Sequence, residues 1–154
     1  MKKILILILS VMLLTFSCCK KPQGTPVDPT VWLDAFGKYK TENVIIVDTA
    51  LSKAEICSNI PAWLQNADIQ VVNTDTCVFI CNGKYPITIK KEQGTVKYNL
   101  TLTAFDTRFK FVHTGFTYND QPLEKAKKLD KILDSLNVKI LSDMNSLKEF
   151  LKSR

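Results

Sequence analysis

The chain has 154 residues, 45% of them apolar and 23% charged, and a formal net charge of +6. This length and composition fit one small globular domain with an appendage. Loss of an N-terminal segment containing Lys2 and Lys3 would leave a charge of +4 that is spread along the chain. Such a weak and dispersed charge argues against a nucleic-acid-binding protein.

The N-terminus has the three parts of an export signal. Met1 to Lys3 is basic, Ile4 to Leu14 is an apolar run interrupted only by Ser10, and Thr15 to Ser17 leads into two cysteines. The apolar run is too short to cross a bilayer, which takes ~20 apolar residues. We therefore predict a signal peptide over residues 1–17 and an exported protein.

Cys18 and Cys19 stand in a sequence that resembles the lipobox of bacterial lipoproteins. In such proteins the cysteine becomes the mature N-terminus and carries acyl chains that hold the protein at a membrane. Ser17 suits the position before the cleaved bond, which favours Cys18 as the lipidated residue and leaves Cys19 as the alternative. The resemblance implies a lipid anchor to the cell envelope, at the outer rather than the inner membrane, with the domain facing the periplasm or the surface.

Residues 18–42 are predicted to contain the lipidated cysteine, a tether and a short helix. The stretch from Lys20 to Pro29 is rich in Pro, Gly and polar residues, as extended tethers are. Asp28 followed by Pro29 is typical of a helix start, and apolar residues follow at helical spacing. We expect a helix from Asp28 to Phe36 that ends at Gly37.

The globular domain is predicted over residues 43–118, and it begins with a strand and a helix. Four consecutive apolar residues between Asn43 and Asp48 predict a strand buried on both faces. SKAE, from Ser52 to Glu55, is typical of a capping box. Apolar residues then recur at three- and four-residue spacing and predict a helix that packs on a sheet, despite Pro61 within it. They are Ile56, Ile60, Trp63 and Leu64.

The next fifty residues predict four antiparallel strands. Their expected bounds are Ile69 to Asn73, Cys77 to Ile89, Thr95 to Phe105 and Arg108 to Tyr118. The third alternates apolar and polar residues, which indicates one buried and one solvated face. The dipeptide Asp106-Thr107 joins the last two strands as a hairpin, and a phase shift of the apolar residues predicts a β-bulge at Gly115.

Residues 119–154 are predicted to form an amphipathic helix that covers the sheet. Apolar residues recur at three- and four-residue spacing from Leu129 to Leu151. About thirty helical residues would measure ~45 Å, so the helix should break near Asn137 or project beyond the sheet. A self-associating coiled coil is the alternative interpretation of the same apolar stripe.

The succession of strand, capped helix, four strands and long helix resembles an exported bacterial domain of unknown function with a TATA-binding-protein-like (TBP-like) fold, which is common in lipoproteins. The segments that carry the resemblance are VIIV, LSKAEIC with PAWL, and YNLTLTAFDTRFKFVHTGFTY. The resemblance implies an α+β fold with a single antiparallel sheet of about five strands. Its element order is β-α-β-β-β-β-α, with both helices on one face. It implies no reaction and no cofactor.

Catalytic and metal-binding motifs are missing from the sequence. The single histidine, His113, lies on a predicted strand, and neither HExxH nor a pair of CxxC motifs supplies zinc ligands. The most specific catalytic hypothesis would be a cysteine nucleophile with His113 as its general base, but nothing in the sequence orients the imidazole. We therefore expect a half-buried structural histidine, no cofactor and no enzymatic activity, with an envelope enzyme of unrecognised site as the alternative.

Three cysteines lie within the predicted domain. Cys77 and Cys81 are four residues apart on one predicted strand, about 13 Å along an extended chain, which is too far for a disulfide. Cys57, on the capped helix, could reach either of them. Buried free thiols are the expectation, and a disulfide from Cys57 to Cys77 or Cys81 is the alternative, which an exported protein permits.

Two tripeptides, DTA and DSL, resemble the Asp-Ser/Thr-apolar acceptor of bacterial O-glycosylation. They make Thr49 and Ser135 candidate modification sites. Thr49 follows a predicted strand, and Ser135 lies within the predicted C-terminal helix.

The functional hypothesis is a membrane-anchored binding or assembly module. The solvated face of the third strand, with Lys97, Asn99, Thr101 and Thr103, would contact a protein, a glycan or another envelope component. DNA binding by analogy to the fold is disfavoured, because export separates the domain from DNA and a fold alone does not carry function.

Overall fold

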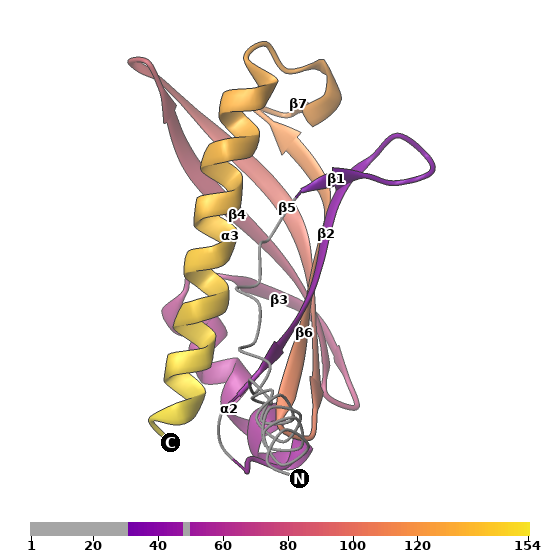
Figure 1. Ribbon diagram of the computed structural model, residues 1–154, viewed down its shortest axis with the longest axis vertical. Helices are drawn as coiled ribbons and strands as arrows, with labels where there is room; N and C mark the ends of the chain where they lie inside the picture. The colour runs from indigo at the N-terminus through magenta and orange to yellow at the C-terminus, as the bar shows by residue number, and fades with distance from the viewer. Residues whose placement is uncertain (1–30, 48–49) are drawn as a thin grey trace, which may run out of the picture.

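The computed structural model describes residues 31–47 and 50–154, which form one antiparallel sheet with two helices on one of its faces (Figure 1). The main elements follow in the order β2 (Tyr39–Ile46), α2 (Lys53–Asn66), β3 (Gln70–Asp75), β4 (Val78–Ile89), β5 (Glu92–Phe105), β6 (Arg108–Tyr118) and α3 (Leu129–Lys152). Shorter elements are β1 (Trp32–Leu33), β7 (Gln121–Pro122) and the 3-10 helix η1 (Leu123–Lys125). The predicted α+β class and the order β-α-β-β-β-β-α are confirmed.

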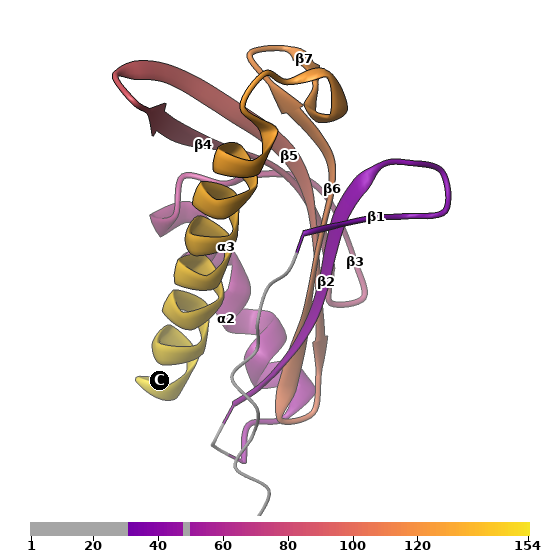
Figure 2. The same cartoon turned by 45° about the horizontal axis from the view of Figure 1, so that its top comes forward.

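The sheet has the strand order β1-β2-β6-β5-β4-β3, with β7 paired to β6. Every pair of neighbouring strands is antiparallel. The consecutive strands β2 and β3 lie on opposite sides of the central strands, so the connection that contains α2 must cross the sheet. Figure 2 shows α2 and α3 on the same side of the sheet, and within residues 31–47 and 50–154 no helix lies on its other face.

The helix α2 is the predicted capped helix. The Ser52 hydroxyl accepts a hydrogen bond from the Glu55 backbone N–H at 3.3 Å, and the Glu55 carboxylate accepts one from the Ser52 N–H at 2.8 Å. These reciprocal bonds are the predicted capping box. On the sheet side the Trp63 indole N–H donates to the Ser146 hydroxyl of α3 at 3.2 Å, so the two helices also contact each other. The buried residues are those predicted, namely Ile56, Ile60, Trp63 and Leu64.

The helix α3 lays the predicted apolar stripe on the sheet. Its 24 residues give a length of about 36 Å at 1.5 Å per residue, and it runs through Asn137 without a break. The predicted span of 119–154 is wrong at its start, because α3 begins only at Leu129. Pro122 instead pairs with Thr117 of β6, and Lys128 has a left-handed φ of 66° that separates η1 from the helix. The buried stripe consists of Ile132, Leu136, Ile140, Met144, Leu147 and Leu151.

The strand β2 differs from its prediction in burial and in length. It begins at Tyr39, and its apolar residues alternate between the two faces of the sheet. Val44 and Ile46 are 47% and 64% exposed, whereas Ile45 is only 5% exposed. The prediction of a strand buried on both faces is wrong because the helices cover only one face.

The predicted helix from Asp28 to Phe36 is also wrong in its described part, residues 31–36. Trp32 pairs with Lys40, so β1 and β2 form a hairpin. Within the turn the Asp34 carboxylate accepts hydrogen bonds from the backbone N–H groups of residues 36 and 38, both at 2.9 Å. An aspartate that binds nearby backbone N–H groups stabilises a turn in competition with a helix. Gly37 follows with a left-handed φ of 70°.

The predicted β-bulge at Gly115 is confirmed. Asn99 of β5 lies opposite Thr114, whereas Lys97 lies opposite Thr117, so a single residue of β5 faces two residues of β6. Gly115 has a left-handed φ of 62°, which glycine adopts without steric cost.

Three polar side chains, Tyr98 of β5, Tyr85 of β4 and Asp143 of α3, contact one another in succession on the helix side of the sheet. We call them the polar chain. The rings of Tyr98 and Tyr85 stack with centroids 4.5 Å apart, and the Tyr85 hydroxyl donates to the Asp143 carboxylate at 2.6 Å. Burial raises the pKa of Asp143, and the hydrogen bond from Tyr85 opposes that rise. Tyr85 therefore stabilises a carboxylate that the fold has partly removed from water.

The α2 helix is tied to the turn between β3 and β4 by a disulfide. Cys57 and Cys77 are bonded, with their Cα atoms 5.2 Å apart, and Cys81 is a buried free cysteine. The two turn residues, Thr76 and Cys77, both have positive φ values, of 42° and 69°. Such a tight hairpin turn usually carries Asn or Gly. The disulfide therefore stabilises a backbone conformation that threonine and cysteine disfavour.

The polar chain predicts a pH-dependent effect of Tyr85→Phe. A carboxyl group whose pKa is raised by folding adds stability below its unfolded pKa, and this stability is lost as the pH rises through the folded value. Removing the donor raises the folded pKa further. We expect the free energy of unfolding to fall by about 2 kcal/mol at pH 7 and by less at pH 3, measured by urea denaturation.

Tyr39→Phe is the matched control, because it removes a hydroxyl from a half-buried tyrosine on β2. It should change stability little at either pH. Equal losses for Tyr85→Phe at both pH values would contradict the role assigned to Asp143.

The disulfide predicts a cross-linked peptide in the unreduced protein. Cleavage before Asp68 and Asp75 separates Cys57 from Cys77 and should leave the two fragments joined until a reductant is added. Closing a loop between residues 20 positions apart should stabilise the fold by about 3 kcal/mol, so Cys57→Ala should lower the free energy of unfolding by that amount. Alkylation of all three cysteines after unfolding without reductant would disprove the bond.

Candidate functional site

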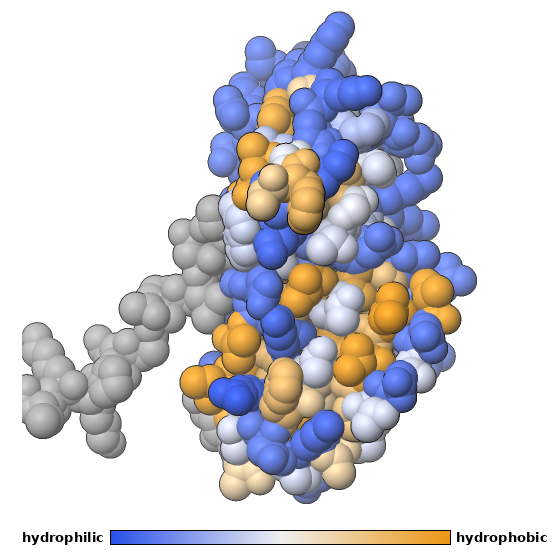
Figure 3. All heavy atoms as spheres, turned by 90° about the vertical axis from the view of Figure 1, so that its right-hand side faces the viewer, coloured by the Kyte–Doolittle hydropathy of each residue, from blue (hydrophilic) through white to orange (hydrophobic). Residues whose placement is uncertain are grey.

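The face of the sheet that carries no helix has an exposed apolar area, which we call the apolar strip. Figure 3 views this side of the molecule and shows hydrophobic residues gathered over the lower part of the sheet. Large apolar residues on a solvated sheet face are unusual when they form a group, and they mark surfaces for interaction. The strip comprises the exposed Val44, Ile46, Ile80 and Phe105 and the half-buried Val78 and Val112.

Strand register brings the apolar strip together from four strands. Val112 of β6 lies beside Thr101 of β5, which lies beside Ile80 of β4. One row further along, Lys110 of β6 lies next to Val44 of β2. The apolar members therefore share neighbouring rows of one face, with threonines of β5 and the charged Lys110 and Arg108 of β6 between them.

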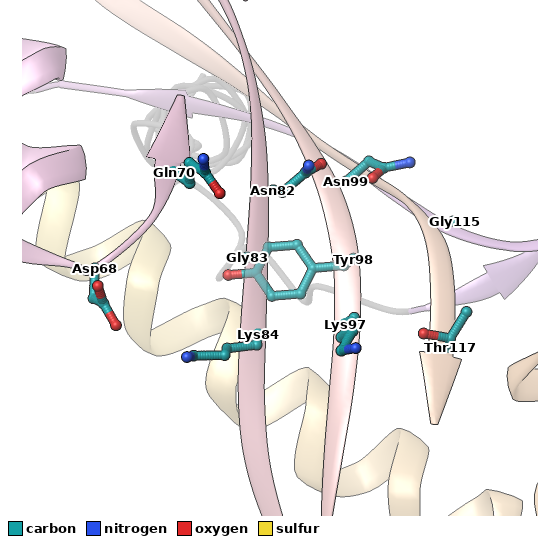
Figure 4. A pocket seen from close by; sticks show the side chains of 10 residues that line it. All are labelled: Asp68, Gln70, Asn82, Gly83, Lys84, Lys97, Tyr98, Asn99, Gly115 and Thr117. Atoms are coloured by element: carbon teal, nitrogen blue, oxygen red, sulfur yellow. The ribbon is translucent and has the colours of Figure 1, made fainter. Parts of the chain in front are cut away.

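Next to the strip, the same face contains a hollow of about 470 Å³, which we call the polar groove (Figure 4). Two rows of side chains run across the strands on its surface. Gln70 of β3, Asn82 of β4 and Asn99 of β5 are cross-strand neighbours and form the first row. The second row consists of Lys84, Lys97 and Thr117, which are neighbours on β4, β5 and β6. Asp68, from the turn before β3, also lines the groove.

Two glycines shape the groove. A Cβ atom at Gly83 would collide with the ring of Tyr98, which crosses this position on the helix side of the sheet. A Cβ atom at Gly115 would lie 2.7 Å from the Asn99 side-chain nitrogen, so the bulge leaves room for that carboxamide against β6. The bulge in β6 thus shapes the groove, while Gly83 leaves room for the Tyr98 ring behind it.

The groove combines amide groups with charges of both signs. Lys84 lies directly opposite Lys97, and Lys97 forms an ion pair with Asp120 at 2.6 Å. Within residues 31–47 and 50–154, Lys84 has no ion pair, and the carboxamides of the first row make no hydrogen bonds. The groove therefore offers donors and acceptors that the protein itself leaves unused.

The structure places the predicted contact residues on the helix-free face. Lys97 and Asn99 line the groove, while Thr101 and Thr103 lie further along β5, between members of the apolar strip. Sequence reasoning missed Gln70, Asn82 and the other groove residues on β3, β4 and β6. Alternation along β4 could have indicated Asn82 and Lys84, but only the register shows that they meet β5.

His113 lies in the core rather than at a site, and it is fully buried instead of half-buried. Its Nδ1 is 3.1 Å from the Thr41 hydroxyl, and its ring contacts Tyr98 and Phe116. Burial lowers the pKa of His113 to about 3, so the imidazole is neutral at ordinary pH. In the described chain no cysteine is among its hydrogen-bond or ring partners, so the structure does not bring together the nucleophile and base pair.

The other candidate residues are placed as follows. Residues 1–17, Cys18, Cys19 and Thr49 lie outside the described residues. Ser135 lies in α3, where its hydroxyl donates to the backbone carbonyl of Lys131 at 3.0 Å, and its modification remains a prediction. Of the two partners considered for Cys57, the structure brings Cys77 to it and leaves Cys81 in the core.

The described residues contain neither a metal-binding cluster nor a helix that could span a membrane. No group of three or more His, Cys, Asp or Glu side chains in this part of the chain is arranged to hold a metal ion. None of the helices in the same residues is long and apolar enough to span a membrane.

Comparisons with known proteins concern the fold. No family model and no curated protein matches the chain. A TBP-like protein from Parabacteroides distasonis has a similar structure, with a TM-score of 0.63 and 14% identity over 75% of this chain and 93% of that chain. A DUF4468 family protein from Bacteroides ovatus gives a TM-score of 0.56 and 13% identity over 77% of this chain and 90% of that one. At these identities the likeness shows a TBP-like fold alone.

Proposed function

We propose that this protein is an exported, lipid-anchored binding module of the cell envelope that uses its helix-free sheet face to bind a partner. The observation that carries the proposal is the contrast between the two faces. One face is buried under α2 and α3, while the other exposes the apolar strip and the polar groove side by side.

The lipid anchor is supported by the N-terminal sequence. A basic start, an apolar run of about eleven residues and a small residue before Cys18 are the features of a lipoprotein signal. Several acyl chains on one cysteine hold a protein stably at a membrane. The Pro- and Gly-containing stretch after Cys19 would then act as a tether between the membrane and the domain. An outer-membrane location is part of this proposal.

Binding is favoured over catalysis by the chemistry of the groove. Carboxamides such as those of Asn82 and Asn99 donate and accept hydrogen bonds but do not exchange protons near neutral pH. The groups whose pKa is most shifted by burial, Tyr85 and His113, lie on the opposite side of the sheet, in the core. The surface therefore has the means to recognise a partner, and the groups with the most shifted pKa do not line it.

The partner we propose is a protein or a glycan of the envelope, and not a nucleic acid. The apolar strip suits a protein surface, because burial of apolar area stabilises a complex. The groove suits a polar ligand that uses many hydrogen bonds.

One experiment in intact cells tests both the anchor and the face. The full-length chain is expressed with a photo-crosslinking amino acid at Ile80, in the apolar strip, and the cells are fed a palmitate analogue. We expect the protein to carry the lipid label and to form a specific crosslinked species. The lipid label should be lost in Cys18→Ala and kept in Cys19→Ala.

The matched control places the crosslinker at Asn145, an exposed residue on the outer side of α3. It should give no specific crosslink. Persistence of the lipid label when both Cys18 and Cys19 are alanine would exclude the anchor. Crosslinks that are the same from Ile80 and Asn145, or none from Ile80, would exclude the helix-free face as the binding surface.

A further inference from the structure

We propose that the polar groove binds an extended oligosaccharide, an inference that rests on the proposed binding role of the helix-free face. The ligand class follows from the three carboxamides in one row, from the charged groups beside them and from the way the sheet holds them in place.

The row formed by Gln70, Asn82 and Asn99 matches the chemistry of a sugar. Each carboxamide presents one acceptor oxygen and two N–H donors, and a sugar hydroxyl both donates and accepts. These carboxamides make no hydrogen bond within the described residues, so a ligand would not have to break protein contacts to reach them. A hydroxyl-rich ligand can bind both the acceptor oxygen and the N–H donors of every amide, whereas an anion such as phosphate would use only the donors.

The spacing of the row matches a repeating ligand. The three residues lie on adjacent strands and face each other directly, so their side chains leave the backbone at points about 4.8 Å apart, the separation of neighbouring strands. This distance is close to the length of one sugar unit in an extended chain. An oligosaccharide that crosses the strands would therefore meet one carboxamide per unit.

Charged groups at the groove strengthen such binding. Figure 4 shows the side chains of Asp68 and Lys84 on the same side of the groove, with Lys97 and Thr117 along its second row. A carboxylate accepts hydrogen bonds from sugar hydroxyls, an ammonium donates to them, and bonds to charged groups are the stronger ones. Because the groove carries both signs, it does not select for a strongly anionic ligand.

The sheet fixes the backbone from which the key amides extend before a ligand arrives. The Asn99 carboxamide occupies the space that a side chain at Gly115 would fill, and Asn82 lies next to Gly83, behind which the Tyr98 ring is packed. Tyr98 is in turn stacked on Tyr85, which is bonded to Asp143. Groups on paired strands over a packed core lose less conformational entropy on binding than groups on a loop.

The test is a titration of the full-length protein, purified in detergent and labelled with ¹⁵N, with two trisaccharides. Cellotriose presents hydroxyls alone, and chitotriose has the same linkage with acetamido groups. We expect saturable shifts of the side-chain NH₂ signals of Gln70, Asn82 and Asn99 with at least one of them. The signal of Asn145, an exposed amide on α3, should not move.

Two variants test whether the shifts of the NH₂ signals arise from binding in the groove. Asn82→Ala and Asn99→Ala remove exposed side chains, so each should leave the urea midpoint of unfolding unchanged. Each should weaken binding about five- to tenfold, as expected for the loss of one hydrogen-bonding group. Asn145→Ala is the matched control and should bind as before.

The outcomes distinguish a failure of oligosaccharide binding from a failure of the proposed binding role. Shifts in the groove amides that the two variants abolish or weaken support oligosaccharide binding. No saturable shift with either trisaccharide, or equal binding by the variants, overturns it. A crosslink from Ile80 in cells together with no sugar binding would retain the binding module and reject only this ligand class.

Discussion

The packing of α3 on one face of the sheet is the interaction on which the rest of the structure depends. Each fully buried apolar side chain of its stripe contributes about 2 kcal/mol by removing apolar surface from water, and the stripe is continuous from Ile132 to Leu151. The helix α2 crosses the same face and contacts α3 through Trp63 and Ser146. Because both helices lie on one side, the other face of the sheet stays open. The apolar strip and the polar groove exist for that reason.

Much of this fold could be predicted from local patterns. The capping box of Ser52, the apolar stripe of α3 and the alternation of β5 each act within one element, where spacing along the chain determines which side chains share a face. The bulge at Gly115 was also visible, as a change in apolar phase. Each of these features can be seen in the spacing of residue types along the chain.

The wrong predictions have a common cause. Each depends either on a contact between elements or on a side chain that binds backbone groups in place of a helix. Val44 and Ile46 looked buried because a run of apolar residues usually marks a strand covered on both faces. The turn at Asp34 looked helical because the spacing of apolar residues does not reveal a carboxylate that binds nearby backbone N–H groups. The groove escaped prediction for a related reason: Gln70, Asn82 and Asn99 are distant in sequence and meet only through strand register.

The central claim, that the sheet is covered on one face only, is tested most directly by unfolding two adjacent variants of β2. Ile45 and Ile46 are identical residues that point to opposite faces and are 5% and 64% exposed. Urea denaturation should show that Ile45→Lys lowers the free energy of unfolding by about 3 kcal/mol or more, because it buries an unpaired charge. Ile46→Lys should change it by no more than about 0.5 kcal/mol. Similar losses for the two variants would contradict the account, because they would mean that the face without helices is buried as well.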